Sequence, residues 1–259
     1  MSILNRIMRA GSVACILLIS LHASAQENHV VLSAGPSTAV AKLFLDQISK
    51  NAGGEKLTFE IDPRSIKHAG GVLSSDTHLF GRTGRPLNDA ERAQNKKEII
   101  LARIPIVVVS GSQAGVKKIT SAQLEGIFTR KIVNWRELGG ADHPIVIMGR
   151  EPTEAAFSQL KKDFPFFNHV VFDETLTRDH QVVNFMRSVK GDYAIGFGAK
   201  PNFDGFPVLT VDNFEPGLSH GLVYDEKNAS HPLVLLAQDY AKENAWRNVL
   251  KQAGFYSPE

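Results

Sequence analysis

Cysteine is almost absent from this sequence, because Cys15 is the only one among 259 residues. A single cysteine cannot form an internal disulfide, so a small disulfide-stapled scaffold is excluded. The hydrophobic fraction of 43% and the charged fraction of 22% are ordinary for a globular protein and exclude a disordered chain. Stability must therefore come from the size and packing of a core, in one large domain or in two lobes.

An excess of charge of one sign is also absent. The chain has 29 Lys and Arg residues against 27 Asp and Glu residues. A surface that binds nucleic acid normally shows a strong basic excess, so we expect no nucleic-acid partner. Bulk attraction cannot concentrate an anion on such a chain, and any selectivity for anions has to come from a few local donors.

The N-terminus has the pattern of a secretory signal peptide. Arg6 and Arg9 form a positive region, Ala10 to Leu21 is apolar, and Ala23-Ser24-Ala25 is a small-x-small cleavage site. The apolar run is too short for a permanent membrane anchor, which needs about 20 residues. Residues 1–25 are predicted to be removed, which leaves a cysteine-free chain with equal numbers of acidic and basic residues in the periplasm. The alternatives are a soluble helix and a lipid anchor at Cys15.

Motifs of common enzymes and metal sites are missing. The nine His residues are scattered without a His-Glu-x-x-His or similar spacing, and no P-loop or dinucleotide fingerprint occurs. Each His is expected at the surface or at a helix cap. Ser158 to Lys161 fits Ser-x-x-Lys, but it lies in an amphipathic helix without an accompanying Lys-Thr-Gly. The sequence predicts a protein that is not an enzyme and has no cofactor.

Short apolar runs alternate with amphipathic stretches, which is typical of an α/β fold. We expect strands at Val30–Ser33, Lys56–Ile61, Ile104–Val109, Pro144–Met148 and Tyr193–Gly198. Helices are expected after Gly35-Pro36, after Thr120-Ser121, at Glu154–Lys162, at Asp179–Lys190 and, ending before Gly254, at His231–Gln252.

One block of sequence resembles a known family. It runs from Ile119 to Arg150 and contains a helix that ends in Ile-Phe, a Lys-x-x-Asn-Trp turn, a Leu-Gly-Gly loop and a strand that ends in Arg. These features are similar to the centre of the phosphate-binding periplasmic proteins of ABC importers. The segments Gly35–Thr38, Gly81–Leu87 and Gly191–Phe197 resemble further parts of that family in the same order.

The resemblance implies a type II periplasmic-binding-protein fold, in which two crossover strands join two α/β lobes around a ligand cleft. The crossovers are expected near Val107–Gly111 and near Phe197–Lys200. The first lobe would then comprise residues 26–109 and 199–259, and the second lobe residues 110–198. This discontinuous layout accounts for the lack of a flexible linker.

Oxyanions are bound by backbone N–H groups at helix N-termini, by hydroxyl groups and by Arg side chains. Arg150 ends a buried strand and precedes the helix expected to open at Thr153, an arrangement that suits a bidentate clamp. The candidate ligand-binding residues are Ser37, Thr38, Arg82, Thr83, Arg85, Arg150 and Thr153, with Arg64 and Ser65 as weaker additions. Ser37 and Thr38 are equally the residues of a simple N-cap, and Arg82 and Arg85 also fit solvated surface positions.

Two departures from the family pattern bear on the ligand. Leu79 stands where the family has an Asp that accepts a proton from the ligand, and Arg150 to Glu154 lacks the family's glycines. We therefore expect a monomer that binds phosphate or a related small anion, with an ABC permease as a possible partner. Two alternatives are a sensory or scaffold module that has lost phosphate binding, and an acidic cleft for a cation or organic solute.

Overall fold

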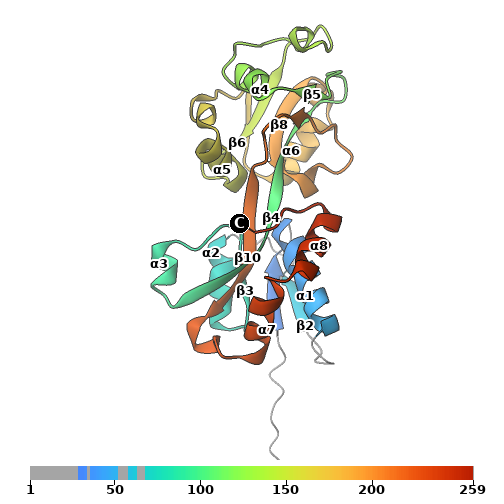
Figure 1. Cartoon of the computed structure of the whole chain (residues 1–259). Coiled ribbons are helices and arrows are strands. Elements are labelled where there is room, and N and C mark those ends of the chain that lie inside the picture. The colour runs from blue at the N-terminus through green and yellow to red at the C-terminus, as the bar shows by residue number, and fades with distance from the viewer. Residues whose placement is uncertain (1–28, 34–35, 52–57, 63–67, 259) are drawn as a thin grey trace, which may run out of the picture.

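A computed structural model describes residues 29–33, 36–51, 58–62 and 68–258 of the chain. The predicted signal peptide, Arg64 and Ser65 lie outside these residues. The chain forms an upper and a lower lobe in Figure 1, each with its own helices packed against strands. Within the described part of the chain, no helix combines the length and the apolar character needed to cross a membrane.

The described elements alternate between strands and helices. The strands are β1 (His29–Ser33), β2 (Thr58–Asp62), β3 (Gly81–Thr83), β4 (Lys96–Ser110), β5 (Lys118–Ile119), β6 (Val146–Arg150), β7 (Glu174–Leu176), β8 (Ala194–Ala199), β9 (Thr210–Val211) and β10 (Gly217–Asp225). The helices are α1 (Pro36–Asn51), α2 (His68–Leu73), α3 (Asp89–Arg92), α4 (Ser121–Phe128), α5 (Ala155–Asp163), α6 (Asp179–Met186), α7 (Pro232–Tyr240) and α8 (Asn244–Ala253). The α/β class predicted from the sequence is confirmed.

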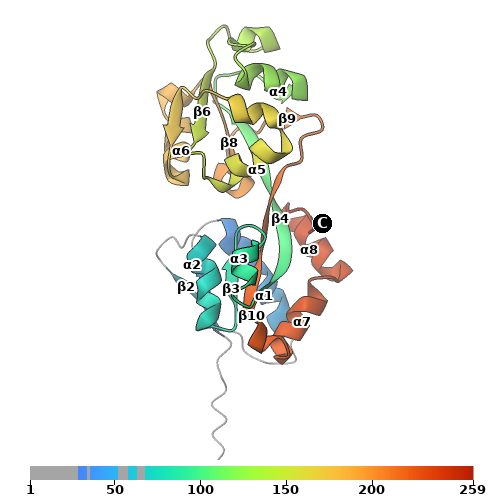
Figure 2. The ribbon, with the colours of Figure 1, turned by 90° about the vertical axis from the view of Figure 1, so that its left-hand side faces the viewer.

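One strand, β4, belongs to both lobes. The main sheet has the order β3-β10-β4-β8-β6-β7. The first part of β4 pairs with β10 in the first lobe, and Ile106 to Ser110 pair with β8 in the second. Figure 2 shows β4 and the chain leading into β10 passing between the lobes. Two connections between lobes are what the type II binding-protein fold requires.

The return to the first lobe differs from the prediction. After β8 the chain remains with the second lobe, because Phe203 packs in its core and β9 pairs in parallel with β5. The chain crosses back between β9 and β10, so the expected boundary at residue 198 and the crossover near Phe197–Lys200 are wrong. A two-residue strand such as β9 has too little periodicity to be recognised in the sequence.

The C-terminal region of the first lobe also differs from the prediction. The stretch His231–Gln252, expected as one helix, is divided into α7 and α8. Tyr240 and Trp246 would point about 120° apart on a continuous helix. The break lets both rings contact Phe44 of α1, at centroid distances of 5.7 and 4.9 Å. The stretch is therefore broken into two helices because both rings pack in the core. Gly254 ends α8 in the left-handed conformation, as expected.

The family-like motif of the second lobe has a structural function. Thr120 caps α4, with its hydroxyl accepting the N–H of Gln123 at 3.1 Å. Asn134 caps a short 3-10 turn, and Trp135 is buried, with its Nε1–H donating to the carbonyl of Tyr193 at 2.8 Å. These contacts hold α4 and the following loop against the sheet that carries β6 to the cleft.

Candidate functional site

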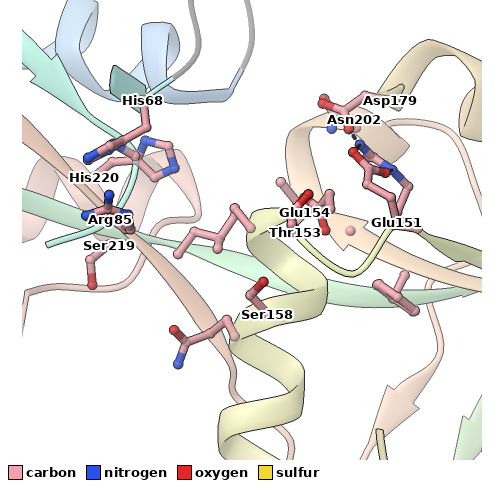
Figure 3. Close-up of a pocket in the computed structure, with 18 of the residues that line it drawn as sticks. His68, Arg85, Glu151, Thr153, Glu154, Ser158, Asp179, Asn202, Ser219 and His220 are labelled. Carbon is pink, nitrogen blue, oxygen red and sulfur yellow. Dashed lines mark hydrogen bonds and ion pairs between the residues drawn. The ribbon is translucent and has the colours of Figure 1, made fainter. Parts of the chain in front are cut away.

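A cavity of about 860 Å³ lies between the two lobes. Its first-lobe wall comes from α2, β3 with the loop after it, and β10, and its second-lobe wall from β6, α5, α6 and β8. In Figure 3 the labelled His68, Arg85 and His220 lie on one side, and Glu151, Glu154 and Asp179 lie on the other. The cavity has the position of the ligand cleft expected from the resemblance.

The described residues of the first-lobe wall include hydrogen-bond donors. Arg82, on β3, lines the cavity with only 6% of its surface exposed, and burial lowers the pKa of its guanidinium to about 10, so it stays charged at neutral pH. Arg85 follows in the next loop and also lines the cavity. None of the described first-lobe residues that line the cavity carries a carboxylate. This wall is suited to an anionic group.

Arg85 is held in place by Glu91. Glu91 also forms a capping box with Asn88 at the N-terminus of α3. The guanidinium makes two bonds to the carboxylate, Nη1 to Oε2 at 2.9 Å and Nη2 to Oε1 at 3.0 Å. Burial opposes the charge of Glu91, but hydrogen bonds from Arg85, the Asn88 backbone and His68 outweigh it and lower the pKa of Glu91 to about 2. Much of the donor capacity of Arg85 is thus committed inside the first lobe.

His68 links this carboxylate to the loop after β3. The backbone N–H of Gly84 donates to Nδ1 of His68 at 3.2 Å, so that nitrogen carries no proton. Nε2 then carries the proton and donates to Oε1 of Glu91 at 2.8 Å. Burial lowers the pKa of His68, which agrees with a neutral ring. His68 therefore positions the loop that carries Gly84 and Arg85 rather than supplying charge.

His220, on β10, is the most unusual residue of the cavity wall. It is 7% exposed, and neither ring nitrogen has a hydrogen-bond partner among the described residues. Burial first, and then the charge of Arg82, lowers the pKa of His220 to about 3. The pairing of β10 with β4 shifts by one residue between His220 and Gly221, and such bulges redirect side chains. A buried neutral imidazole offers one donor and one acceptor to a ligand.

The second-lobe wall is different, because Arg150 is already occupied. Its Nε donates to Glu151 Oε2 and to the Leu176 carbonyl, both at 3.0 Å, and Nη1 is ion-paired with Asp179. Burial disfavours the charge of Arg150, but the neighbouring carboxylates raise its pKa above the usual value. In this structure Arg150 binds carboxylates of its own lobe.

The N-terminus of α5 is also occupied. Glu154 is the N-cap, and its Oε2 accepts the N–H of Phe157 at 2.7 Å. Burial raises the pKa of Glu154, against the effect of the Ala156 and Phe157 N–H groups and of Arg150. The prediction that Thr153 opens this helix is wrong, since the longer carboxylate one residue later makes the capping bond. Thr153 is exposed and lines the cavity.

The structure thus brings four predicted residues to one cavity, namely Arg82, Arg85, Arg150 and Thr153. Thr83 is fully buried behind the wall, and its hydroxyl bonds to the Arg85 backbone. The side chains of Ser37 and Thr38, in the first turn of α1, lie outside the described part of the structure. Leu79 packs against the first-lobe core and does not line the cavity.

Sequence reasoning missed His68, His220 and Asp179. The expectation that each His lies at the surface or at a cap is wrong for His220, and nothing in the run Leu218-Ser219-His220 distinguishes it from a strand residue that faces solvent. Asp179 reaches Arg150 only through the packing of α6 beside β6. The described residues contain no group of three or more His, Cys, Asp and Glu side chains able to hold a metal ion.

Two α/β lobes connected by two crossings, with a polar cavity between them, define a solute-binding protein fold. The family described as the PBP superfamily domain matches residues 22–197, more than half of the chain. The chain therefore belongs to the periplasmic-binding-protein superfamily.

Similar proteins have names that refer to phosphate. The chain is 25% identical to "Phosphate-binding protein PstS" of Borreliella burgdorferi over 139 residues, which is 52% of this chain and 49% of that protein. It is 42% identical to "Phosphate-binding protein PstS" of Bacillus subtilis over 66 residues, 24% of this chain and 22% of that protein. These matches span half or less of the relatives' length.

A solved structure extends the likeness of the fold to nearly the whole chain. It is a putative phosphate ABC transporter substrate-binding protein from Clostridium perfringens with bound phosphate, at a TM-score of 0.66 and 20% identity. The alignment covers 90% of this chain and 100% of that chain. The fold predicted from the sequence is confirmed.

Proposed function

We propose that this protein captures a small oxyanion, phosphate or a related anion, in the cavity between its lobes and delivers it to an ABC importer. The observation that carries the proposal is the first-lobe wall, where the buried guanidinium of Arg82 and the ring of His220, whose nitrogens have no partner among the described residues, line the cavity. Buried donors of this kind favour an anionic group, since they lose little by exchanging water for a charged acceptor.

The phosphate-binding relatives support this ligand class, and capture from outside the cytoplasmic membrane agrees with the leader sequence expected at residues 1–25. A monomer with a mobile cleft is sufficient for the task, because hinge closure would bring the second-lobe wall onto the ligand. In this proposal an ABC permease is the partner, and no cofactor or chemical step takes part.

A second function, a sensory or scaffold module that has lost phosphate binding, is favoured by one observation. Arg150 and the N-terminus of α5, the two anion donors of the second lobe, are bound by Glu151, Asp179 and Glu154 of the chain itself. A free dianion would have to displace these carboxylates or bind without the second lobe.

Isothermal titration of the mature chain with phosphate, sulfate and molybdate at pH 7.5 separates the two functions. Binding of one anion at micromolar concentration supports capture for transport. Thermal melting provides an independent measurement, because a ligand that binds only the folded state stabilises it by RT ln(1 + [L]/Kd). If no anion at millimolar concentration produces heat or a shift in Tm, the transport proposal is wrong.

A further inference from the structure

The two walls of the cavity have opposite chemistry. The described first-lobe wall carries Arg82, Arg85 and His220 and no acid, whereas the second-lobe wall carries Glu151, Glu154 and Asp179. We propose that the ligand is bipolar, with an oxyanion group that binds the first-lobe wall and a protonated amine that binds the second-lobe carboxylates. This inference rests on the proposed function and specifies the class of its ligand.

Arg150 has little hydrogen-bonding capacity left for an incoming anion. Each of its three nitrogens already donates, to carboxylates at Glu151 and Asp179 or to the carbonyls of Leu176 and Thr177. An anion at this point would replace a carboxylate that the fold supplies and would meet the remaining ones. Like charges at such distances disfavour each other.

The N-terminus of α5, the second group of donors in this lobe, also has little capacity left for an incoming anion. Glu154 places its own carboxylate on the N–H of Phe157 at 2.7 Å, where an external anion would otherwise bind. Three carboxylates therefore line this wall, and the cations there are Arg150 and Lys162. A carboxylate accepts at about four lone-pair positions, so bonds to Arg150 leave capacity for an ammonium group. Asp179 in particular is 50% exposed.

An unsatisfied polar side chain on the first-lobe wall independently indicates a ligand site. His220, on the opposite wall, is more than nine-tenths buried, lines this cavity and has no described partner for either ring nitrogen. Leaving a buried polar group unsatisfied destabilises the protein, and a hydrogen bond from a ligand atom would remove that cost. The evidence for a ligand at the first-lobe wall therefore does not depend on the carboxylates of the second-lobe wall.

The size of the cavity agrees with a ligand larger than one ion. Its volume of about 860 Å³ lies within the range of about 300–1,000 Å³ typical of sites for organic molecules. A molecule that carries its anion and its amine at two ends would reach both walls, whereas a lone tetrahedral ion at Arg82 would leave the carboxylates without a cation from the ligand.

The test is isothermal titration of the mature protein at pH 7.5 with matched pairs of compounds. The pairs are 2-aminoethylphosphonate with ethylphosphonate and 3-aminopropylphosphonate with propylphosphonate, and inorganic phosphate is titrated alongside. In at least one pair we expect the amine to bind about tenfold more tightly than its alkyl partner and than phosphate, as charge-assisted bonds allow.

Two variants locate the amine. Asp179→Asn acts on a half-exposed side chain and so should fold; Glu154→Gln keeps an oxygen that can cap α5. Each variant should reduce the preference for the amine to about threefold or less. Asp179→Asn should also tighten binding of inorganic phosphate, because it releases Arg150. Glu125→Gln, on an exposed position of α4 outside the cavity, is the matched control and should change nothing.

The outcomes separate the inference from the function on which it rests. If phosphate and the alkylphosphonates bind as tightly as the amines, the bipolar ligand is wrong while anion capture stands. A preference for the amine that survives both Asp179→Asn and Glu154→Gln also overturns the inference, because the amine then binds elsewhere. If none of the compounds binds, the proposed function fails and the inference with it.

Discussion

Asp179 and Arg150 form an ion pair that joins the first turn of α6 to the end of β6. Asp179 lies at a helix N-terminus, where a negative charge is stabilised, and Arg150 is 8% exposed. The pair is therefore part of the architecture of the second lobe as well as of the cavity wall. Changes at Arg150 should affect folding before they affect ligand binding.

The first prediction concerns this structural role. Arg150→Met removes the guanidinium from Glu151 and Asp179, and we expect the free energy of unfolding to fall by about 2 kcal/mol because the two carboxylates lose their cation. Urea denaturation at pH 7.5 measures the change. Arg136→Met is the control, since its pair with Asp142 is exposed and should contribute about 0.5 kcal/mol or less. Equal losses in the two variants would contradict this role of Arg150.

The second prediction compares the two first-lobe arginines. Arg82→Gln should weaken phosphate binding about tenfold or more, because Arg82 is a buried, charged residue of the cavity wall. Arg85→Gln should weaken it by about threefold or less, since Arg85 is bound by Glu91 at two points. Isothermal titration measures both, with Arg92→Gln, outside the cavity, as the control. A larger loss for Arg85→Gln would reverse the assignment.

The third prediction concerns the effect of pH on stability. In the folded protein the pKa of His220 is lowered to about 3 by burial first, and then by the charge of Arg82. Below its unfolded value of about 6.5 the unfolded chain binds a proton that the folded chain does not, so stability falls as the pH falls through this window. Relative to His220→Gln, the unmodified protein should lose about 2.3 kcal/mol between pH 6.5 and pH 4.5.

Urea unfolding at the two pH values gives this difference. The carboxyl group of Glu154, whose raised pKa acts in the opposite direction, is present in both proteins and does not enter the comparison. Parallel pH profiles for the two proteins would mean that the protonated ring of His220 finds hydrogen-bond acceptors in the folded protein.

The fourth prediction concerns Gly111, which follows the end of β4 in the second lobe. A Cβ atom at Gly111 would lie 2.1 Å from the Gly191 carbonyl oxygen and 2.2 Å from that of Asp192, both of them backbone atoms. Gly111→Ala should therefore lower the free energy of unfolding by about 1–3 kcal/mol. At Gly84 the nearest atom would be 3.6 Å away, so Gly84→Ala should change stability by about 0.5 kcal/mol or less. A tolerated alanine at position 111 would show that the 191–192 turn moves readily.

Local signals predicted the fold well. Thr120 caps the start of α4, as expected, and Gly254 ends the last helix. These features depend on residues within one turn of each other, which a sequence displays directly. The crossing back after β9 was misplaced because it depends on pairing between Thr210 and Lys118, far apart in the chain.

The site was harder to predict, because its contacts also join residues that are far apart in the chain. The arginine at the end of β6 was recognised from its neighbours in sequence, but its partner Asp179 is 29 residues away and meets it only after α6 has packed. His220 acquires its environment from a bulge between β10 and β4, which side-chain alternation does not reveal. Sequence therefore indicated the donors of the cavity, and packing determined which of them the protein already uses.

The position of β10 has a consequence for how the protein folds. β10 lies between β3 and β4 in the sheet, although all of the second lobe separates it from them in the chain. The first lobe thus lacks an inner strand of its sheet until residues after 216 have emerged from the ribosome. Contacts of such large sequence separation form slowly, because a long loop has to close first. We expect the second lobe to collapse early, and the first-lobe strands β3 and β4 to stay without β10 until synthesis is nearly complete.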